Sequence, residues 1–149
     1  LSQLNQFLGQ ERYREADAVL RPFIPRLPGG PNWCPEARAA AVWALGLIHE
    51  GKGEDSLVSA VLERLNDTPP GPPGPDNMRI RRMAAITLAR LRAQEAVASL
   101  RKYCPVQEPG PDPVHNACGW AIEQLTGEVM QPPKTIQKMR PDWFLIPVK

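Results

Sequence analysis

The 149-residue chain lacks the features of several protein classes. It has no run of 18 apolar residues, which excludes a membrane-spanning helix on length. Aromatic residues make up only 6%, and alternating β-branched segments are nearly absent, so strands have little support. Three cysteines cannot all pair with one another, which argues against a disulfide framework and slightly favours a cytoplasmic location. The chain begins at Leu1 without a signal peptide or an initiator Met, so we expect it to be a piece of a longer protein.

Proline, by contrast, is abundant, with 18 residues that separate the apolar runs. Between the proline clusters, apolar residues recur at the spacing of one helix face. This pattern predicts helices over residues 2–8, 11–20, 32–51, 55–65, 77–91, 94–103 and 113–125. The predicted fold class is therefore all-α.

The predicted helices are copies of one another. Leu45 aligns with Leu88 at an offset of 43 residues, and Ile122 follows at a further 34. Other first-helix columns are Ala37/Ile80/Val114, Ala41/Ala84/Cys118, Ile48/Leu91/Leu125 and the large residues Trp43/Ile86/Trp120. The second-helix columns are Ala16/Val58/Val97, Val19/Val61/Leu100 and Phe23/Leu65/Cys104. Helix pairs that repeat at this interval indicate an α-solenoid, in which each pair buries its apolar face against its neighbours.

Two segments carry a family resemblance: RAAAVWALGLI (residues 38–48) and IRRMAAITLARL (residues 80–91), each followed by an AV-x-x-L-like helix. They resemble HEAT repeats, and most closely the short bacterial HEAT-like repeat first described in phycobilin lyases. The resemblance implies a HEAT-like domain of about three to four repeats over residues 1–128, the first truncated. Residues 129–149 are then an extended Pro-rich tail. Repeats of this kind serve scaffolds, lyases and nucleic-acid enzymes alike, so the resemblance implies a fold and not a function.

Residues with catalytic or metal-binding chemistry are few. The resembled family includes an iron-dependent hydroxylase with repeated His-Glu pairs, whereas this chain has only His49-Glu50. His115, Cys118 and Cys104 could supply three zinc ligands. Both cysteines, however, occupy apolar columns of the repeat, where a free cysteine packs as a small hydrophobe. We therefore predict no catalytic residue, no metal site and no cofactor.

Charge suggests a partner surface. Residues 69–104 contain seven Lys and Arg but only two Asp and Glu, although the whole chain has a net charge of only +2. Arg79, Arg82, Arg101 and Lys102 are the candidate partner-binding residues, because such a block could bind phosphate backbones or an acidic protein. Tyr103 is the only nearby aromatic residue, so stacking with single-stranded nucleic acid lacks support.

The tail supplies two further candidates. Trp143 and Phe144 belong to four consecutive apolar residues between Pro141 and Pro147. A terminal solenoid repeat exposes an apolar face unless something covers it, so this segment either caps the last repeat or docks onto another protein.

These observations favour a non-enzymatic protein–protein interaction scaffold with an unidentified protein partner. The alternative is a nucleic-acid-binding α-solenoid that uses the Arg-rich third repeat. A HEAT-like lyase or metalloenzyme is a third, less favoured hypothesis.

The repeat alignment makes a prediction about Leu88. Because Leu88 shares the central apolar column with Leu45 and Ile122, Leu88→Ala should lower the free energy of unfolding by about 2–5 kcal/mol. Urea unfolding of the variant measures this loss. A change within ~0.5 kcal/mol, typical of a surface substitution, would show that the alignment is wrong.

Overall fold

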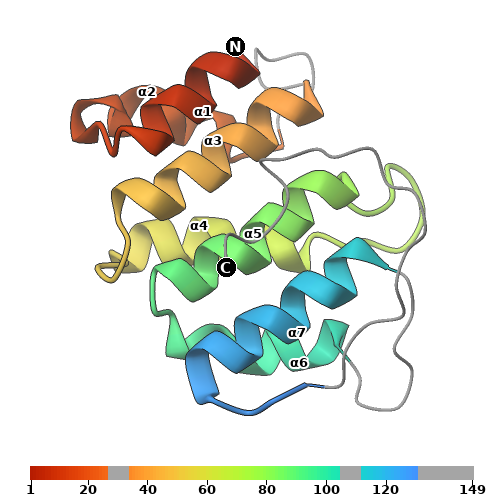
Figure 1. Cartoon of the computed structure of the whole chain (residues 1–149). Helices are drawn as coiled ribbons and strands as arrows, with labels where there is room; N and C mark the ends of the chain where they lie inside the picture. Colours follow the sequence, from red (N-terminus) through yellow and green to blue (C-terminus); the bar gives the residue numbers. More distant parts are fainter. Residues whose placement is uncertain (27–33, 105–111, 131–149) are drawn as a thin grey trace.

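A computed structural model describes residues 1–26, 34–104 and 112–130, which form helices and turns with no strand among them (Figure 1). The α-helices are α1 (Ser2–Gln10), α2 (Asp17–Leu20), α3 (Pro35–Ile48), α4 (Asp55–Asn66), α5 (Met78–Arg90), α6 (Val97–Tyr103) and α7 (Pro113–Thr126). Short 3₁₀ helices flank α2 (η1, Arg14–Ala16; η2, Arg21–Phe23) and precede α6 (η3, Gln94–Ala96). The predicted all-α fold class is confirmed for these residues. The tail candidates Trp143 and Phe144 lie outside them.

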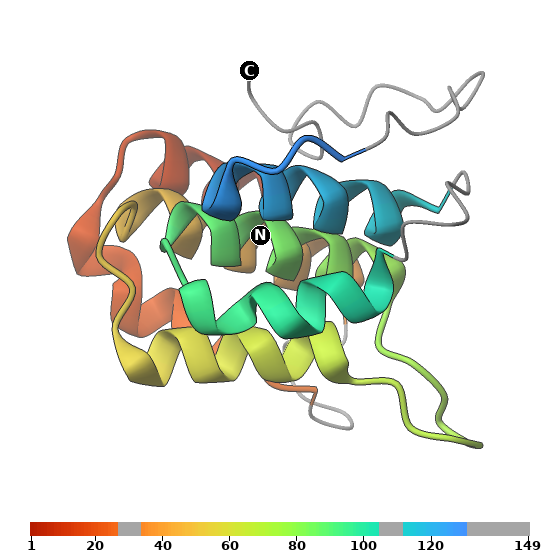
Figure 2. The same ribbon diagram turned by 90° about the horizontal axis from the view of Figure 1, so that it is seen from below.

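The helices form two layers. In the first layer α1 contacts α3, α3 contacts α5, and α5 contacts α7. The second-layer helices each pack on the first-layer helix that follows them in the chain: α2 on α3, α4 on α5 and α6 on α7. Figure 2 shows α4 and α6 on one side of the α5 and α7 layer. The helices α3, α5 and α7 therefore each contact a first-layer neighbour and one second-layer helix.

The core lies between the layers and along the first-layer contacts. Leu45, Leu88 and Ile122 are fully buried, as their shared column predicts. Small residues bring the backbones of α3 and α5 together: a Cβ on Gly46 would lie only 2.8 Å from Thr87 Oγ1. Thr87 itself is buried, and its hydroxyl donates to a carbonyl of α3 at 2.9 Å. Close packing of this kind fixes how α3 and α5 lie against each other.

The predicted second-helix columns are wrong in the first copy. Val19 is 62% exposed, whereas its neighbour Leu20 is fully buried. The structural equivalent of Ala16 is Ala96, because the N–H of each bonds to the carbonyl three residues earlier at 3.1 Å. Counting onward from these turns aligns Leu20 with Leu100, which is also fully buried. The alignment of the first copy is therefore off by one residue, because the four-residue helix α2 is too short to show a periodic pattern.

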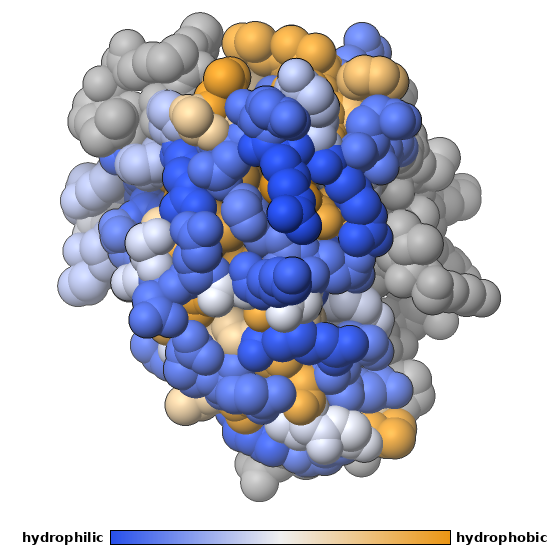
Figure 3. Space-filling model, turned by 90° about the vertical axis from the view of Figure 1, so that its left-hand side faces the viewer, coloured by the Kyte–Doolittle hydropathy of each residue, from blue (hydrophilic) through white to orange (hydrophobic). Residues whose placement is uncertain are grey.

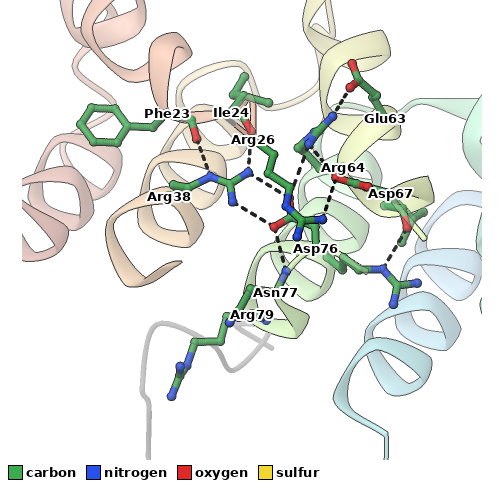
Figure 4. A network of polar contacts seen from close by, with 12 residues as sticks. Phe23, Ile24, Arg26, Arg38, Glu63, Arg64, Asp67, Asp76, Asn77 and Arg79 are labelled. Carbon is green, nitrogen blue, oxygen red and sulfur yellow. Dashed lines mark hydrogen bonds and ion pairs between the residues drawn. The ribbon is translucent and has the colours of Figure 1, made fainter. Parts of the chain in front are cut away.

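Arg38 and Asp76 form an ion pair in the interior (Figure 4). Two nitrogens of the guanidinium donate to the two carboxylate oxygens, each at 2.9 Å, and both side chains are at least 95% buried. Arg38 also donates to the carbonyls of Phe23 at 3.3 Å and Ile24 at 3.0 Å, where the first second-layer segment ends. A cation stabilises such a helix end, where unpaired carbonyls carry partial negative charge.

The next repeat contains the same type of contact. Arg81, aligned with Arg38, donates from Nε to the carbonyl of Leu65 at 3.1 Å, near the end of α4. Its guanidinium also lies 4.7 Å from the ring centroid of Tyr103. An arginine of the first-layer helix thus binds the end of the preceding second-layer helix in two successive helix pairs.

The Asp76 carboxylate also lies near Arg64 of α4. Arg64 lies 2.9 Å from Asp67 and 3.5 Å from Asp76, and the N–H of Asn77 donates to Asp76 at 2.8 Å (Figure 4). The N–H of Asp76 in turn bonds to the carbonyl of Asp67 at 2.9 Å, which closes the proline-rich loop between them. Arg26 from the preceding repeat donates to that loop at Gly74 O, 2.8 Å away. These contacts join three successive helix ends around one carboxylate.

We expect Asp76→Asn to lower the free energy of unfolding by about 3–5 kcal/mol at neutral pH, because Arg38 would lose its buried counter-charge. Burial alone would raise the pKa of Asp76, but the hydrogen bonds and charge of Arg38, the N–H of Asn77 and the charge of Arg64 hold that pKa below its ordinary value. The ionised carboxylate therefore stabilises the fold above its unfolded pKa of about 4, and this contribution is lost as the pH falls through the lower folded-state pKa.

The difference between wild type and Asp76→Asn in urea unfolding should thus shrink below about pH 4. Glu63→Gln is the control, because Glu63 also pairs with Arg64 but its side chain is 72% exposed; its effect should stay within ~0.5 kcal/mol. An equal difference at neutral and acidic pH would contradict the role assigned to Asp76.

Candidate functional site

The candidate basic residues lie on two helices and face different neighbours. On α5, Arg79 Nη1 lies 3.0 Å from a carboxylate oxygen of Glu36 at the start of α3. On α6, Arg101 pairs with Glu128, just after α7. Lys102 lies beside Arg101, with its ammonium 5.2 Å from the ring centroid of the adjacent tyrosine. Arg82 is half-buried on α5. The structure therefore ties Arg79 and Arg101 to separate glutamates and does not join them into one basic site.

A different surface gathers charged and aromatic side chains. A groove of about 670 Å³ crosses the C-terminal parts of α1, α3, α5 and α7. Figure 3 views the molecule from the side of the turns that follow α1, α3 and α5, and shows mostly hydrophilic side chains with apolar patches between them. The described residues that line the groove are Gln10, Arg12, Trp43, Leu47, Glu50, Ala89, Arg90, Arg92, Trp120 and Gln124.

The groove is built from two repeat positions. Trp43 and Trp120 come from the column of large residues that the sequence alignment found. One helical turn later, Leu47, Arg90 and Gln124 share the next position on the same face. The sequence pattern indicates the column of Trp43 and Trp120 but not a groove, because nothing in the pattern places this helix face outside the core.

Arg90 is an almost fully buried arginine in the groove. It is only 9% exposed, and its guanidinium lies 5.5 Å from the ring centroid of Trp43. Its Nη1 atom is buried and has no hydrogen-bond partner among the described residues. Burial lowers the pKa of Arg90, and the charge of Arg12 lowers it further, while the charge of Glu50 opposes both. A buried guanidinium with an unused donor is costly unless something binds it.

Arg12 and Arg92 occupy equivalent turns with left-handed backbone, at φ 50° and 60°. The N–H of each bonds to the carbonyl three residues back, at 3.0 and 3.1 Å. The N–H of the following residue reaches five residues back, again at 3.0 and 3.1 Å. This is the Schellman helix ending, whose left-handed position usually holds glycine. Gly51 and Gly127, which follow α3 and α7, have φ values of 77° and 75°.

Both strained arginines point toward the next first-layer helix. Arg12 pairs with Glu50 just beyond the end of α3, and Arg92 Nη1 donates to the carbonyl of Gln124 in α7 at 3.2 Å. Together with Arg90, they give the described lining residues of the groove three guanidinium groups and one carboxylate. A left-handed backbone costs a non-glycine residue about 1–2 kcal/mol, so two such arginines in one groove are a marked departure from ordinary turn chemistry.

The cysteines and histidines do not form a second site. Cys104 and Cys118 are buried, and burial raises the pKa of both thiols. His49 Nε2 lies 2.6 Å from a carboxylate oxygen of Asp17. No group of three or more His, Cys, Asp or Glu side chains suited to a metal ion occurs within residues 1–26, 34–104 and 112–130. In the same part of the chain, none of the helices has the length and apolar character needed to cross a membrane.

Comparisons with known proteins add no relative. No protein-family model matches the chain, and neither the curated proteins nor the solved structures gave a match. The groove and its chemistry are therefore argued from this chain alone.

The left-handed turn predicts the effect of Arg92→Gly. Glycine adopts this backbone without strain, so the free energy of unfolding should rise by about 0.5–1 kcal/mol despite the greater chain entropy of glycine. Arg92→Ala is the matched control, because it removes the same side chain but keeps the strain, and it should give no such gain. Urea unfolding distinguishes the two. A gain of equal size in both variants would show that the side chain, and not the backbone, is the source.

Proposed function

We propose that this chain is a non-enzymatic binding module: a short α-solenoid of HEAT-like repeats that holds an extended segment of a protein partner in the groove formed by Trp43, Arg90 and Trp120. The observation that carries the proposal is Nη1 of Arg90, buried and without a partner among the described residues, in a groove lined by residues of α1, α3, α5 and α7. An open groove across successive helices suits an extended chain, which contacts several repeats at once.

The repeat assignment is supported by contacts that recur along the chain. Arg38 and Arg81 bind the ends of the preceding second-layer helices, and the turns at Arg12 and Arg92 share their hydrogen-bond pattern. The helix contacts recur too, since each first-layer helix packs on the next. These repeated contacts favour a solenoid over a bundle of unrelated helices.

Nucleic acid is the second candidate, and the charge pairing disfavours it. Phosphate-backbone binding uses basic side chains free to neutralise successive phosphates. Arg79 and Arg101 from the Arg-rich third repeat already contact Glu36 and Glu128.

The lining chemistry favours binding over catalysis. Arginine, tryptophan, leucine and glutamine side chains hold a ligand by charge, apolar contact and hydrogen bonds. Glu50, the carboxylate among the described lining residues, is paired with Arg12, which fits a part in balancing charge. The described lining residues include no cysteine, serine or histidine that could act as a nucleophile.

A randomised display library of roughly 12-residue peptides tests the module. We expect wild-type protein to enrich peptides and Gln124→Trp, which places a large ring on the groove wall, to weaken their binding by about tenfold or more. Ser59→Trp is the control, because Ser59 is exposed on α4, away from the groove lining. Fluorescence anisotropy of labelled peptides measures the affinities. Failure to enrich any peptide, or equal weakening by both substitutions, would overturn the proposal.

A further inference from the structure

We infer that the groove selects acidic peptides and binds one side-chain carboxylate of the peptide at Arg90. This inference rests on the proposed function and specifies its ligand.

Arg90 is buried and has an unused hydrogen-bond donor. Its exposed fraction is 9%, and Nη1 lacks a partner among the described residues although it is buried beside the groove. Arg38, on the neighbouring helix and also buried, has a carboxylate oxygen at 2.9 Å from each of two nitrogens. The same residue type in a similar setting thus shows what Arg90 lacks: a carboxylate that accepts from its free donor.

Other charged side chains line the groove around Arg90. The guanidiniums of Arg12 and Arg92 line the same groove, and Glu50 is the one carboxylate among its described lining residues. Glu50 attracts the Arg90 charge and Arg12 opposes it, but the Glu50 carboxylate is paired with Arg12, and Arg90 Nη1 has no hydrogen-bond partner among the described residues. An anion from outside would find a groove with a surplus of two positive charges and reduced contact with water.

Apolar and amide side chains of the groove indicate what kind of molecule carries the anion. Trp120 and Leu47 are half-buried, and both line the groove near the Arg90 position of the repeat. Gln10 and Gln124 are exposed at opposite edges, on α1 and α7, where amides can bond to a peptide backbone. Apolar contact in the middle and amides at the edges suit an extended peptide that carries an apolar residue beside its acidic one.

The surplus is too small and too local for a polyanion. Three guanidiniums and one carboxylate neutralise one or two negative charges, whereas a nucleic-acid strand presents one phosphate at each nucleotide. A single carboxylate also matches the planar fork of an arginine side chain, which binds it through two parallel hydrogen bonds. The occupant favoured by these observations is therefore an acidic segment of a protein.

The test uses the peptide that the library enriches most strongly and a counterpart in which each Glu or Asp is replaced in turn by Gln or Asn. We expect one such replacement to weaken binding to wild-type protein by about tenfold, the loss of one charge-assisted hydrogen-bonded pair. Arg90→Met should bind the acidic peptide and its amide counterpart equally well. Arg79→Met is the matched control, since Arg79 lies on the same helix outside the groove lining, and it should keep the wild-type preference.

Thermal melting first establishes that each variant folds, and Arg90→Gln replaces Arg90→Met if the latter does not. Enriched peptides without an acidic residue would overturn this inference and leave the binding module standing. Enrichment of no peptide would overturn the module itself. A preference for the acidic peptide that survives in both Arg90 variants would place the carboxylate elsewhere. Displacement of the peptide by duplex DNA at matched concentration and physiological salt would favour the nucleic-acid alternative.

Discussion

The buried ion pair between Arg38 and Asp76 is the contact on which the arrangement of the first-layer helices depends. Arg38 belongs to α3, Asp76 precedes α5, and the two join at 2.9 Å while Arg38 also binds the end of the preceding segment at Ile24. Arg64 adds the end of α4 to the same carboxylate. A buried charge is tolerated only when its partners are in place, so this network fixes the positions of three helix ends together.

The same two helices carry the groove at their other ends. α3 contributes Trp43 and α5 contributes Arg90, and the contact of Gly46 with Thr87 holds the helices close between the ion pair and the groove. Two buried arginines thus stand at opposite ends of one helix–helix contact. The one near the helix starts has its carboxylate partner, and the one near the helix ends has none among the described residues.

Sequence patterns predicted the helices and the column of Leu45, Leu88 and Ile122, because burial in a repeat enforces apolar residues at a fixed spacing. They missed the slip at Val19, since a four-residue helix such as α2 offers too little periodicity to set its register. They did not single out Arg90 among the seven basic residues of 69–104, because spacing along the chain cannot show that its guanidinium lies over Trp43. The ion pair at Asp76 was equally hidden, since it follows a proline-rich loop.

The groove contains two energetically unfavourable features, a left-handed backbone at two arginines and a buried donor without a partner among the described residues. That both occur in one groove is the strongest argument for a bound ligand. Arg12 and Arg92 sit at left-handed turn positions where the other described turns after first-layer helices have glycine. Arg90 is buried and its Nη1 donor has no hydrogen-bond partner among the described residues. Neither feature stabilises the fold, and each could be removed by an ordinary substitution. Local rules of this kind are broken mainly where function requires it. The strained backbone and the unpartnered Nη1 donor involve different residues and different physics, and the acidic ligand that we propose accounts for both: it accepts from Arg90 while the guanidiniums of Arg12 and Arg92 line the same groove.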